Sequence, residues 1–269
     1  MIVLQRIKCL AMRGRGLIVV FGLLLVGCST PSVHFMREGV EATSLSRIDQ
    51  EWILERLWRG DVGGGYREAD SILHVSVDGE TIYVAHPSGV VAAWVGETGK
   101  ELWRRQLSGR IMAGTGVGSK HVVVVDDEGV VRAMRTADGV DEWRQNAGAQ
   151  VLARPVVSGA VVLLRTGGGQ MLAIETVDGS VRWRNRHRVP ELTLRGVSEP
   201  LSHGGRALAG LANGRLSSID LVTGQTIWKV AVDRARGSNE ITRLIDLDSR
   251  PAIVGNVLFA GAYQGRMVA

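Results

Sequence analysis

The chain has 269 residues, 45% of them hydrophobic, which is enough for the core of one or two domains. Its formal net charge is +5, but residues 1–27 contribute four basic side chains and no acidic one, leaving 28 basic against 27 acidic residues in the remainder. A chain so close to neutral beyond residue 27 gives no electrostatic argument for binding nucleic acid or an anionic membrane surface.

Residues 1–27 have the pattern of a secretory signal. A basic region precedes an apolar run over residues 17–26, which is too short to span a bilayer. Residues 25–29 resemble a bacterial lipobox, and this resemblance implies cleavage before Cys28 and lipidation of its sulfur and its new amine. Ser29 after the cysteine resembles lipoproteins sent on to the outer membrane. The alternative is an ordinary signal with an incidental cysteine, and Met12 is an alternative start.

The cysteines and residues 28–48 define the next part of the predicted protein. Cys9 leaves with the signal and Cys28 carries lipid, so the mature chain is expected to have no disulfide. Residues 28–48 are polar and aperiodic, which is typical of a tether, and roughly 20 flexible residues have a span of about 25 Å. Residues 49–269 are predicted to form the folded body.

A repeated frame dominates that body. A glycine is followed ten residues later by a second glycine and fourteen residues later by a tryptophan. Four copies occur, and they start 40, 40 and 45 residues apart. Their members are Gly89, Gly99, Trp103; Gly129, Gly139, Trp143; Gly169, Gly179, Trp183; and Gly214, Gly224, Trp228. A fixed period of this size is the signature of a repeat fold.

Each repeat predicts four short strands. Residues 122–125 and 161–164 are continuous apolar runs, as in strands buried on both faces, and glycine-containing turns follow them. Four strands in about 40 residues correspond to one β-propeller blade, which must stack on its neighbours to bury both flanks. We therefore expect each tryptophan to pack against the next blade.

The two ends of the repeat region depart from this frame. Trp58 is followed by arginine like the other tryptophans but has no preceding glycine frame, so we expect it in an outer strand of the last blade, where it would close a ring. Residues 265–269 align with residues 214–218, so the sequence stops within a blade. An incomplete propeller is the expected fold.

The blade sequence distinguishes between propeller families. Arginine or lysine follows each tryptophan, whereas WD40 blades end in Trp-Asp. Residues 218–228, with Asp220, Thr223, Gly224 and Trp228, resemble the repeat of pyrroloquinoline-quinone (PQQ) type propellers.

Two connections between blades are longer than the others. The glycine-to-glycine interval grows to 45 after Gly169 and to 51 after Gly214, and the extra residues follow Trp183 and Trp228. Connections of one type lie on one face of a propeller, so these two are expected side by side. Leucines alternating with charged residues predict an exposed edge that adds to a partner's sheet. The alternative is a long loop whose leucines fold back onto the core.

Residues 192–196 and 240–248 resemble the corresponding loops of the BamB family, lipoproteins of the outer-membrane β-barrel assembly machinery. The resemblance implies a non-enzymatic scaffold, lipid-anchored on the periplasmic face of the outer membrane, that binds the POTRA domains of BamA. It also implies that this chain holds about half of an eight-bladed ring. The partner-binding residues implied by the resemblance are Leu192, Leu194, Arg195, Asp246 and Asp248. Arg195 would either brace the two loops through the aspartates or join them in reaching across to the partner.

Quinone-dependent dehydrogenases share the blade frame and represent the enzymatic alternative. They hold quinone and Ca²⁺ under a disulfide of adjacent cysteines, a pair that the predicted mature chain lacks. The six histidines show no metal-ligand spacing, and the glycines at 63–65 are not followed by the Lys-Ser/Thr of a phosphate loop. We expect neither a cofactor nor an enzymatic activity. A propeller scaffold with another periplasmic partner remains the other alternative.

Overall fold

The structure is a computed structural model that describes residues 55–63, 74–118, 120–187, 198–233, 246–247, 249–263 and 267–269. The chain divides into two units between Ile53 and Leu54, and every described residue belongs to the second. The predicted signal, the lipidated Cys28 and the tether therefore lie outside the described residues.

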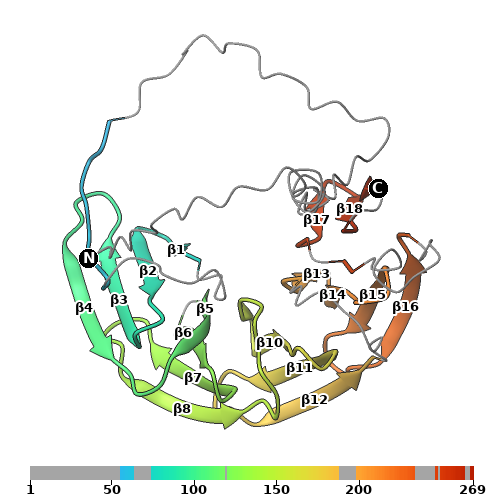
Figure 1. The fold of residues 1–269 in the computed structure, drawn as a ribbon, viewed down its shortest axis with the longest axis horizontal. Coiled ribbons are helices and arrows are strands. Elements are labelled where there is room, and N and C mark those ends of the chain that lie inside the picture. Colours follow the sequence, from blue (N-terminus) through green and yellow to red (C-terminus); the bar gives the residue numbers. More distant parts are fainter. Residues whose placement is uncertain are drawn as a thin grey trace, which may run out of the picture. The chain divides into compact units, whose positions relative to one another are not determined.

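The described residues form antiparallel sheets that follow one another in chain order and contain no helix (Figure 1). Blade 1 comprises β1 (Ser76–Asp78), β2 (Thr81–Ala85), β3 (Val90–Val95) and β4 (Glu101–Gln106). Blade 2 comprises β5 (Ile111–Val117), β6 (His121–Asp126), β7 (Val130–Arg135) and β8 (Asp141–Asn146). Blade 3 comprises β9 (Val156–Ser158), β10 (Val161–Arg165), β11 (Gln170–Glu175) and β12 (Val181–Arg186). Blade 4 comprises β13 (Leu201–His203), β14 (Arg206–Gly210), β15 (Arg215–Asp220) and β16 (Thr226–Ala231). Blade 5 comprises β17 (Ala252–Val254), β18 (Val257–Gly261) and β19 (Met267–Val268).

This arrangement confirms the predicted blades and the all-β class. The strands of each four-stranded sheet pair in sequence order, and the strands that carry the repeated tryptophans, β4, β8, β12 and β16, are edge strands. Strand β6, which contains the apolar run 122–125, is buried at all six positions, and β10 is buried at all five. In the edge strand β8, by contrast, only Trp143 is buried. Apolar sequence thus marks the strands that are covered on both flanks.

Each tryptophan joins its blade to the next. The indole nitrogen of Trp103 donates a hydrogen bond of 2.8 Å to the carbonyl oxygen of Thr136, and that of Trp143 donates one of 2.8 Å to Thr176. Trp183 repeats the contact with the carbonyl oxygen of Leu221 at 3.0 Å. Every acceptor lies in the turn before the fourth strand of the following blade. The predicted packing of each tryptophan on its neighbour is confirmed at these three junctions.

The buried core consists of clusters shared by neighbouring blades. Between blades 2 and 3, for example, Val123, Val131 and Trp143 pack with Leu164 and Ile174. Similar clusters join blades 1 and 2, blades 3 and 4, and blades 4 and 5. Each of these clusters of described residues draws on two blades, so stability depends on the stacking of neighbours.

Trp58 makes the same contact without the predicted strand. Its indole nitrogen donates a 2.7 Å hydrogen bond to the carbonyl oxygen of Gly96, and its ring lies against Gly99 in the corresponding turn of blade 1. Residues 55–63 nevertheless have no strand structure. Strand structure is absent at Trp58, because no hydrogen-bonding neighbour strand lies beside residues 55–63 in the described part of the chain, and its place in a last blade stays a prediction.

Candidate partner-binding site

The connections that follow each fourth strand leave the blades at one end of the strands. The turns before the fourth strands, which receive the tryptophans, lie at the opposite end, because neighbouring strands are antiparallel. The connections after β4 and β8 are short, and those after β12 and β16, residues 187–200 and 232–251, are the long ones. We call these two segments the first and the second long connection.

The two long connections meet where they re-enter the blades. Ser198 donates a hydrogen bond from Oγ to the carbonyl oxygen of Ser249 at 3.0 Å. Beside it, the Glu199 carboxylate lies 3.4 Å from Nε of Arg250. These contacts join residues about fifty positions apart and confirm, at their described ends, the prediction that the two connections lie side by side.

The end of the second long connection is also hydrogen-bonded to blades 4 and 5. The Ser249 hydroxyl donates to the carbonyl oxygen of Gly261 at 2.8 Å and accepts from its N–H at 3.2 Å, which holds the second connection against β18. The backbone N–H of Leu247 donates to the carbonyl oxygen of Leu211 at 3.2 Å. The exits of both connections are thereby fixed relative to blades 4 and 5.

Gly210 permits this close approach. A Cβ at position 210 would lie 2.6 Å from the carbonyl oxygen of Leu247 and 2.9 Å from Oγ of Ser198. Real Cβ atoms do not approach heavy atoms so closely, so a side chain here would push both connections away from β14. Leu247 itself is buried and packs with Leu216 and Ala260 in the cluster between blades 4 and 5.

The connection between blades 2 and 3 contributes a cationic side chain that contacts Glu199. Arg154, which precedes β9, donates from Nη2 to Oε1 of Glu199 at 2.6 Å. The side chain of Glu199 is only 10% exposed and that of Arg154 is 20% exposed. Charge-assisted hydrogen bonds of this length are stronger than neutral ones, and a partly buried carboxylate depends on its cationic partner.

Of the five partner-binding residues predicted from sequence, only Asp246 is among the described residues. Its residue surface is 1% exposed, and its carbonyl oxygen accepts a 2.9 Å hydrogen bond from the N–H of Tyr263. A carboxylate buried in this way presents little surface to a partner, which favours the bracing role over direct contact. The other four, Leu192, Leu194, Arg195 and Asp248, lie outside the described residues.

Sequence reasoning missed Ser198, Glu199, Ser249 and Arg154. The first three stand next to Pro200 or close to Pro251, where the connections turn into the first strand of a blade. A proline just before a strand indicates where a connection enters a blade, but it does not identify the residue of another connection that makes contact there. Arg154 has the same proline signal, because it precedes Pro155 just before β9, but its connection has ordinary length and did not stand out.

The first long connection begins at a buried histidine. His187 is 8% exposed, and neither ring nitrogen has a hydrogen-bond partner among the described residues. Burial, and to a smaller extent the positive charges of Lys229 and Arg165, lowers the pKa of His187 from 6.5 to about 4. The imidazole is therefore neutral at pH 7.

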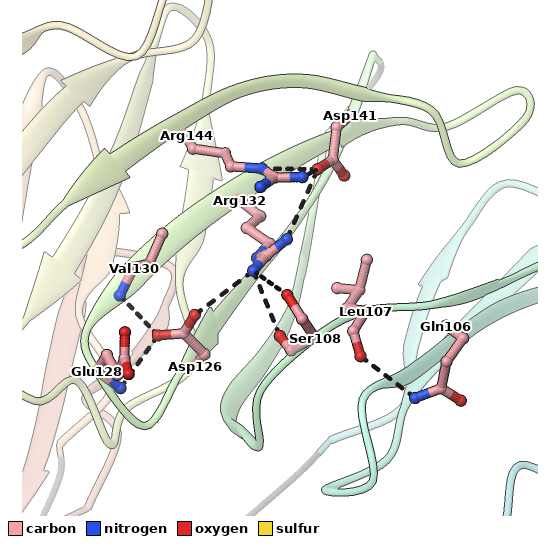
Figure 2. Close-up of polar contacts among 9 residues, drawn as sticks. All are labelled: Gln106, Leu107, Ser108, Asp126, Glu128, Val130, Arg132, Asp141 and Arg144. Atoms are coloured by element: carbon pink, nitrogen blue, oxygen red, sulfur yellow. Dashed lines mark hydrogen bonds and ion pairs between the residues drawn. The ribbon is translucent and has the colours of Figure 1, made fainter.

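A second polar cluster surrounds Arg132 between blades 1 and 2 (Figure 2), although the Nε atom of Arg132 has no hydrogen-bond partner among the described residues. The guanidinium of buried Arg132 donates to the hydroxyl and the carbonyl oxygen of Ser108 at 3.1 and 3.3 Å and lies 3.8 Å from both Asp126 and Asp141. Asp126 in turn accepts hydrogen bonds of 3.1 and 2.8 Å from the N–H groups of Glu128 and Val130. These contacts link the connection after β4 to the turn between β6 and β7, so the cluster joins two blades.

The opposite face carries an open pocket of about 540 Å³ between blades 2 and 3. It is lined by His121, whose Nε2 lies 2.5 Å from Oε2 of Glu142, together with Lys120 and apolar residues that include Val177. In the described part of the chain, no cluster of three or more histidine, cysteine or acidic side chains could hold a metal ion. Nor does any helix there have the length and apolar character needed to cross a bilayer.

The chain resembles known proteins over most of its length. A family model described as outer membrane protein assembly factor BamB matches residues 54–113 and 110–269. The BamB of Pseudomonas aeruginosa is 50% identical over 252 residues, which cover 94% of this chain and 65% of that protein. The BamB of Escherichia coli is 35% identical over 256 residues, which cover 91% of this chain and 65% of that protein. The chain thus spans about two thirds of the length of these relatives.

Solved structures give the same result for the fold. The crystal structure of BamB from Moraxella catarrhalis aligns with a TM-score of 0.68 at 27% identity, covering 72% of this chain and 59% of that one. A quinohemoprotein alcohol dehydrogenase from Comamonas testosteroni aligns with a TM-score of 0.53 at 15% identity over 70% of this chain, which shows a shared fold alone. The blades are those of an incomplete PQQ-type β-propeller, and the chain belongs to the BamB family of outer membrane protein assembly factors.

Proposed function

We propose that this chain is a non-enzymatic scaffold of the outer-membrane β-barrel assembly complex. It binds the POTRA domains of BamA through its two long connections and so assists the assembly and insertion of outer-membrane proteins. The relatives named outer membrane protein assembly factor support the role in assembly. The contact between Ser198 and Ser249 supports this choice of site, because it brings the described ends of the two connections together.

Within this surface, the proposal gives its residues different tasks. Leu192 and Leu194, two positions apart on an extended segment, share a face and are buried together against the partner. Asp246 is buried in the chain itself, which supports a bracing role toward Arg195. Asp248 belongs to the same surface of the second connection.

The attachment to the membrane completes the proposal. Residues 1–27 are removed as a signal, Cys28 carries the lipid, and residues 28–48 tether a propeller that starts at residue 49. Multiple acyl chains on one cysteine anchor stably, whereas a single chain binds a membrane only marginally. This places the scaffold on the periplasmic face of the outer membrane, within reach of the proposed partner.

Hydrogen–deuterium exchange with and without the purified POTRA domains of BamA tests this function. Binding is expected to slow exchange in residues 187–200 and 232–251. The turns around Val177 and Val222, at the opposite end of the strands, serve as the internal control and should be unchanged. An absence of binding, or protection confined to that opposite face, would contradict the proposal.

A further inference from the structure

Glu199 connects three successive interblade connections through one oxygen atom. Its Oε1 lies 2.6 Å from Nη2 of Arg154 and 3.4 Å from Nε of Arg250. Arg154 precedes β9, Glu199 precedes β13 and Arg250 precedes β17, so the three residues occupy corresponding places before blades 3, 4 and 5. The carboxylate is therefore the common ion-pair partner of residues that are far apart in sequence.

The burial of this group makes the link strong. The Glu199 side chain is 10% exposed, so its charge is largely removed from water and requires the two guanidinium groups. Without the carboxylate, Arg154 and Arg250 would face each other as like charges. The neighbouring Ser198 is fully buried and carries the hydrogen bond to Ser249, so a shift at position 199 acts directly on that second contact.

Both contacts stand at the exits of the two long connections. A loop whose end is fixed samples fewer conformations than one whose end moves, and a partner that needs a particular arrangement binds a preformed loop more readily. We infer that Glu199 is a positioning residue that fixes the described ends of the two long connections, residues 198–200 and 249–251, relative to each other and so favours binding of the partner by these connections. This inference rests on the proposed function for the identity of the partner, and it adds a residue outside the predicted contact set.

The expected effect is on the population of the binding-competent arrangement. Apparent affinity falls in proportion to that population, without any loss of contacts in the complex. In Glu199→Ala, the association rate with the BamA POTRA domains should fall about five- to tenfold, while the dissociation rate changes little. In Glu199→Gln the amide oxygen still accepts from Arg154, so the association rate should fall less.

A matched control is available in blade 3. Arg182 and Glu175 form an ion pair at 2.5 Å with side chains 26% and 28% exposed, beside the turn at the opposite end of the strands. Glu175→Ala removes a comparable ion pair without touching the connections. The association rate of Glu175→Ala should equal that of the wild type. This should hold even if Glu175→Ala and the Glu199 variants show a similar small change in melting temperature.

The experiment measures association and dissociation rates on the full chain, together with hydrogen exchange of the free chain. Faster exchange in residues 187–200 and 232–251 of free Glu199→Ala, accompanied by slower association, supports the inference. An association rate and exchange pattern equal to those of Glu175→Ala would overturn it. If the wild type itself does not bind the POTRA domains, the proposed function fails, and exchange in the free chain alone then decides whether Glu199 holds the connections.

Discussion

The indole of Trp143 in blade 2 covers Gly179 in blade 3 so closely that a Cβ at position 179 would lie 2.6 Å from its Cε3 atom. Trp103 with Gly139 and Trp183 with Gly224 show the same relationship. The three glycines also have positive φ angles of +70°, +75° and +72°, so both backbone conformation and space favour glycine there. This contact explains why the sequence repeats its tryptophan and its second glycine at a fixed spacing.

Gly179→Ala should therefore destabilise the propeller through two separate effects. A Cβ there strains a backbone with φ +75° and collides with Trp143, and the expected loss of unfolding free energy is about 2–4 kcal/mol. Gly159→Ala is the matched control, because its φ is +56° and nothing lies within 4 Å of the added Cβ. The control should lose only about 1 kcal/mol in chemical denaturation. Equal losses in the two variants would show that the tryptophan contact contributes nothing.

The buried His187 predicts a pH dependence of stability. Its pKa in the folded chain is about 4, below the ordinary 6.5, so protonation favours the unfolded state. The contribution of the neutral form is complete above about pH 6.5 and is lost as the pH falls towards 4. Because one pKa unit corresponds to 1.36 kcal/mol, the loss attributable to this group is at most about 3 kcal/mol.

His187→Leu should remove that part of the pH dependence. The corresponding positions of blades 1, 2 and 4 hold the apolar residues Leu107, Ala147 and Val232, each of which donates its N–H to the first glycine of its repeat as His187 does. A leucine therefore fits the pattern of the fold. Urea denaturation at pH 7.5 and pH 5 should give a smaller difference for the variant than for the wild type. The same difference in both proteins would exclude His187 as the titrating group.

Lipid attachment at Cys28 predicts a clear labelling result. Radiolabelled palmitate supplied to cells should be incorporated into the wild type and not into Cys28→Ala, because the cysteine sulfur and amine are the proposed acylation sites. The variant should also leave the membrane fraction. Cys9→Ala is the matched control and should be labelled like the wild type. Palmitate found equally in Cys28→Ala and the wild type would refute the lipobox.

The fold was predictable because its main contacts recur at a fixed spacing. Each tryptophan meets a turn in the next blade, and this single relationship is repeated in sequence as in space. Strand β10 was predictable for a related reason, since a strand covered by blades on both flanks is apolar at most of its positions, here Val161–Leu164. Trp58 showed the limit of the pattern, because its docking contact occurs without the strand that accompanies the other tryptophans.

The candidate site was predictable only in its location. The lengthened intervals placed both long connections on one face, and the contact between Ser198 and Ser249 agrees with that. The partnership of Arg154 with Glu199 spans 45 residues and occurs once, so no periodicity reveals it. The burial of Asp246 also depends on how a long connection folds back onto blade 5, which composition does not specify.

The central claim is that the two long connections bind the POTRA domains, and Leu192→Ala combined with Leu194→Ala tests it most directly. Full burial of a leucine is worth about 1.5–3 kcal/mol, so losing both should weaken binding at least tenfold in a calorimetric titration. Val177→Ala combined with Val222→Ala is the matched control, because these side chains are 84% and 71% exposed at the opposite end of the strands. We expect the leucine variant to lose affinity while its circular dichroism spectrum and melting temperature stay unchanged, and the valine variant to bind like the wild type. Wild-type affinity in the leucine variant would contradict the account.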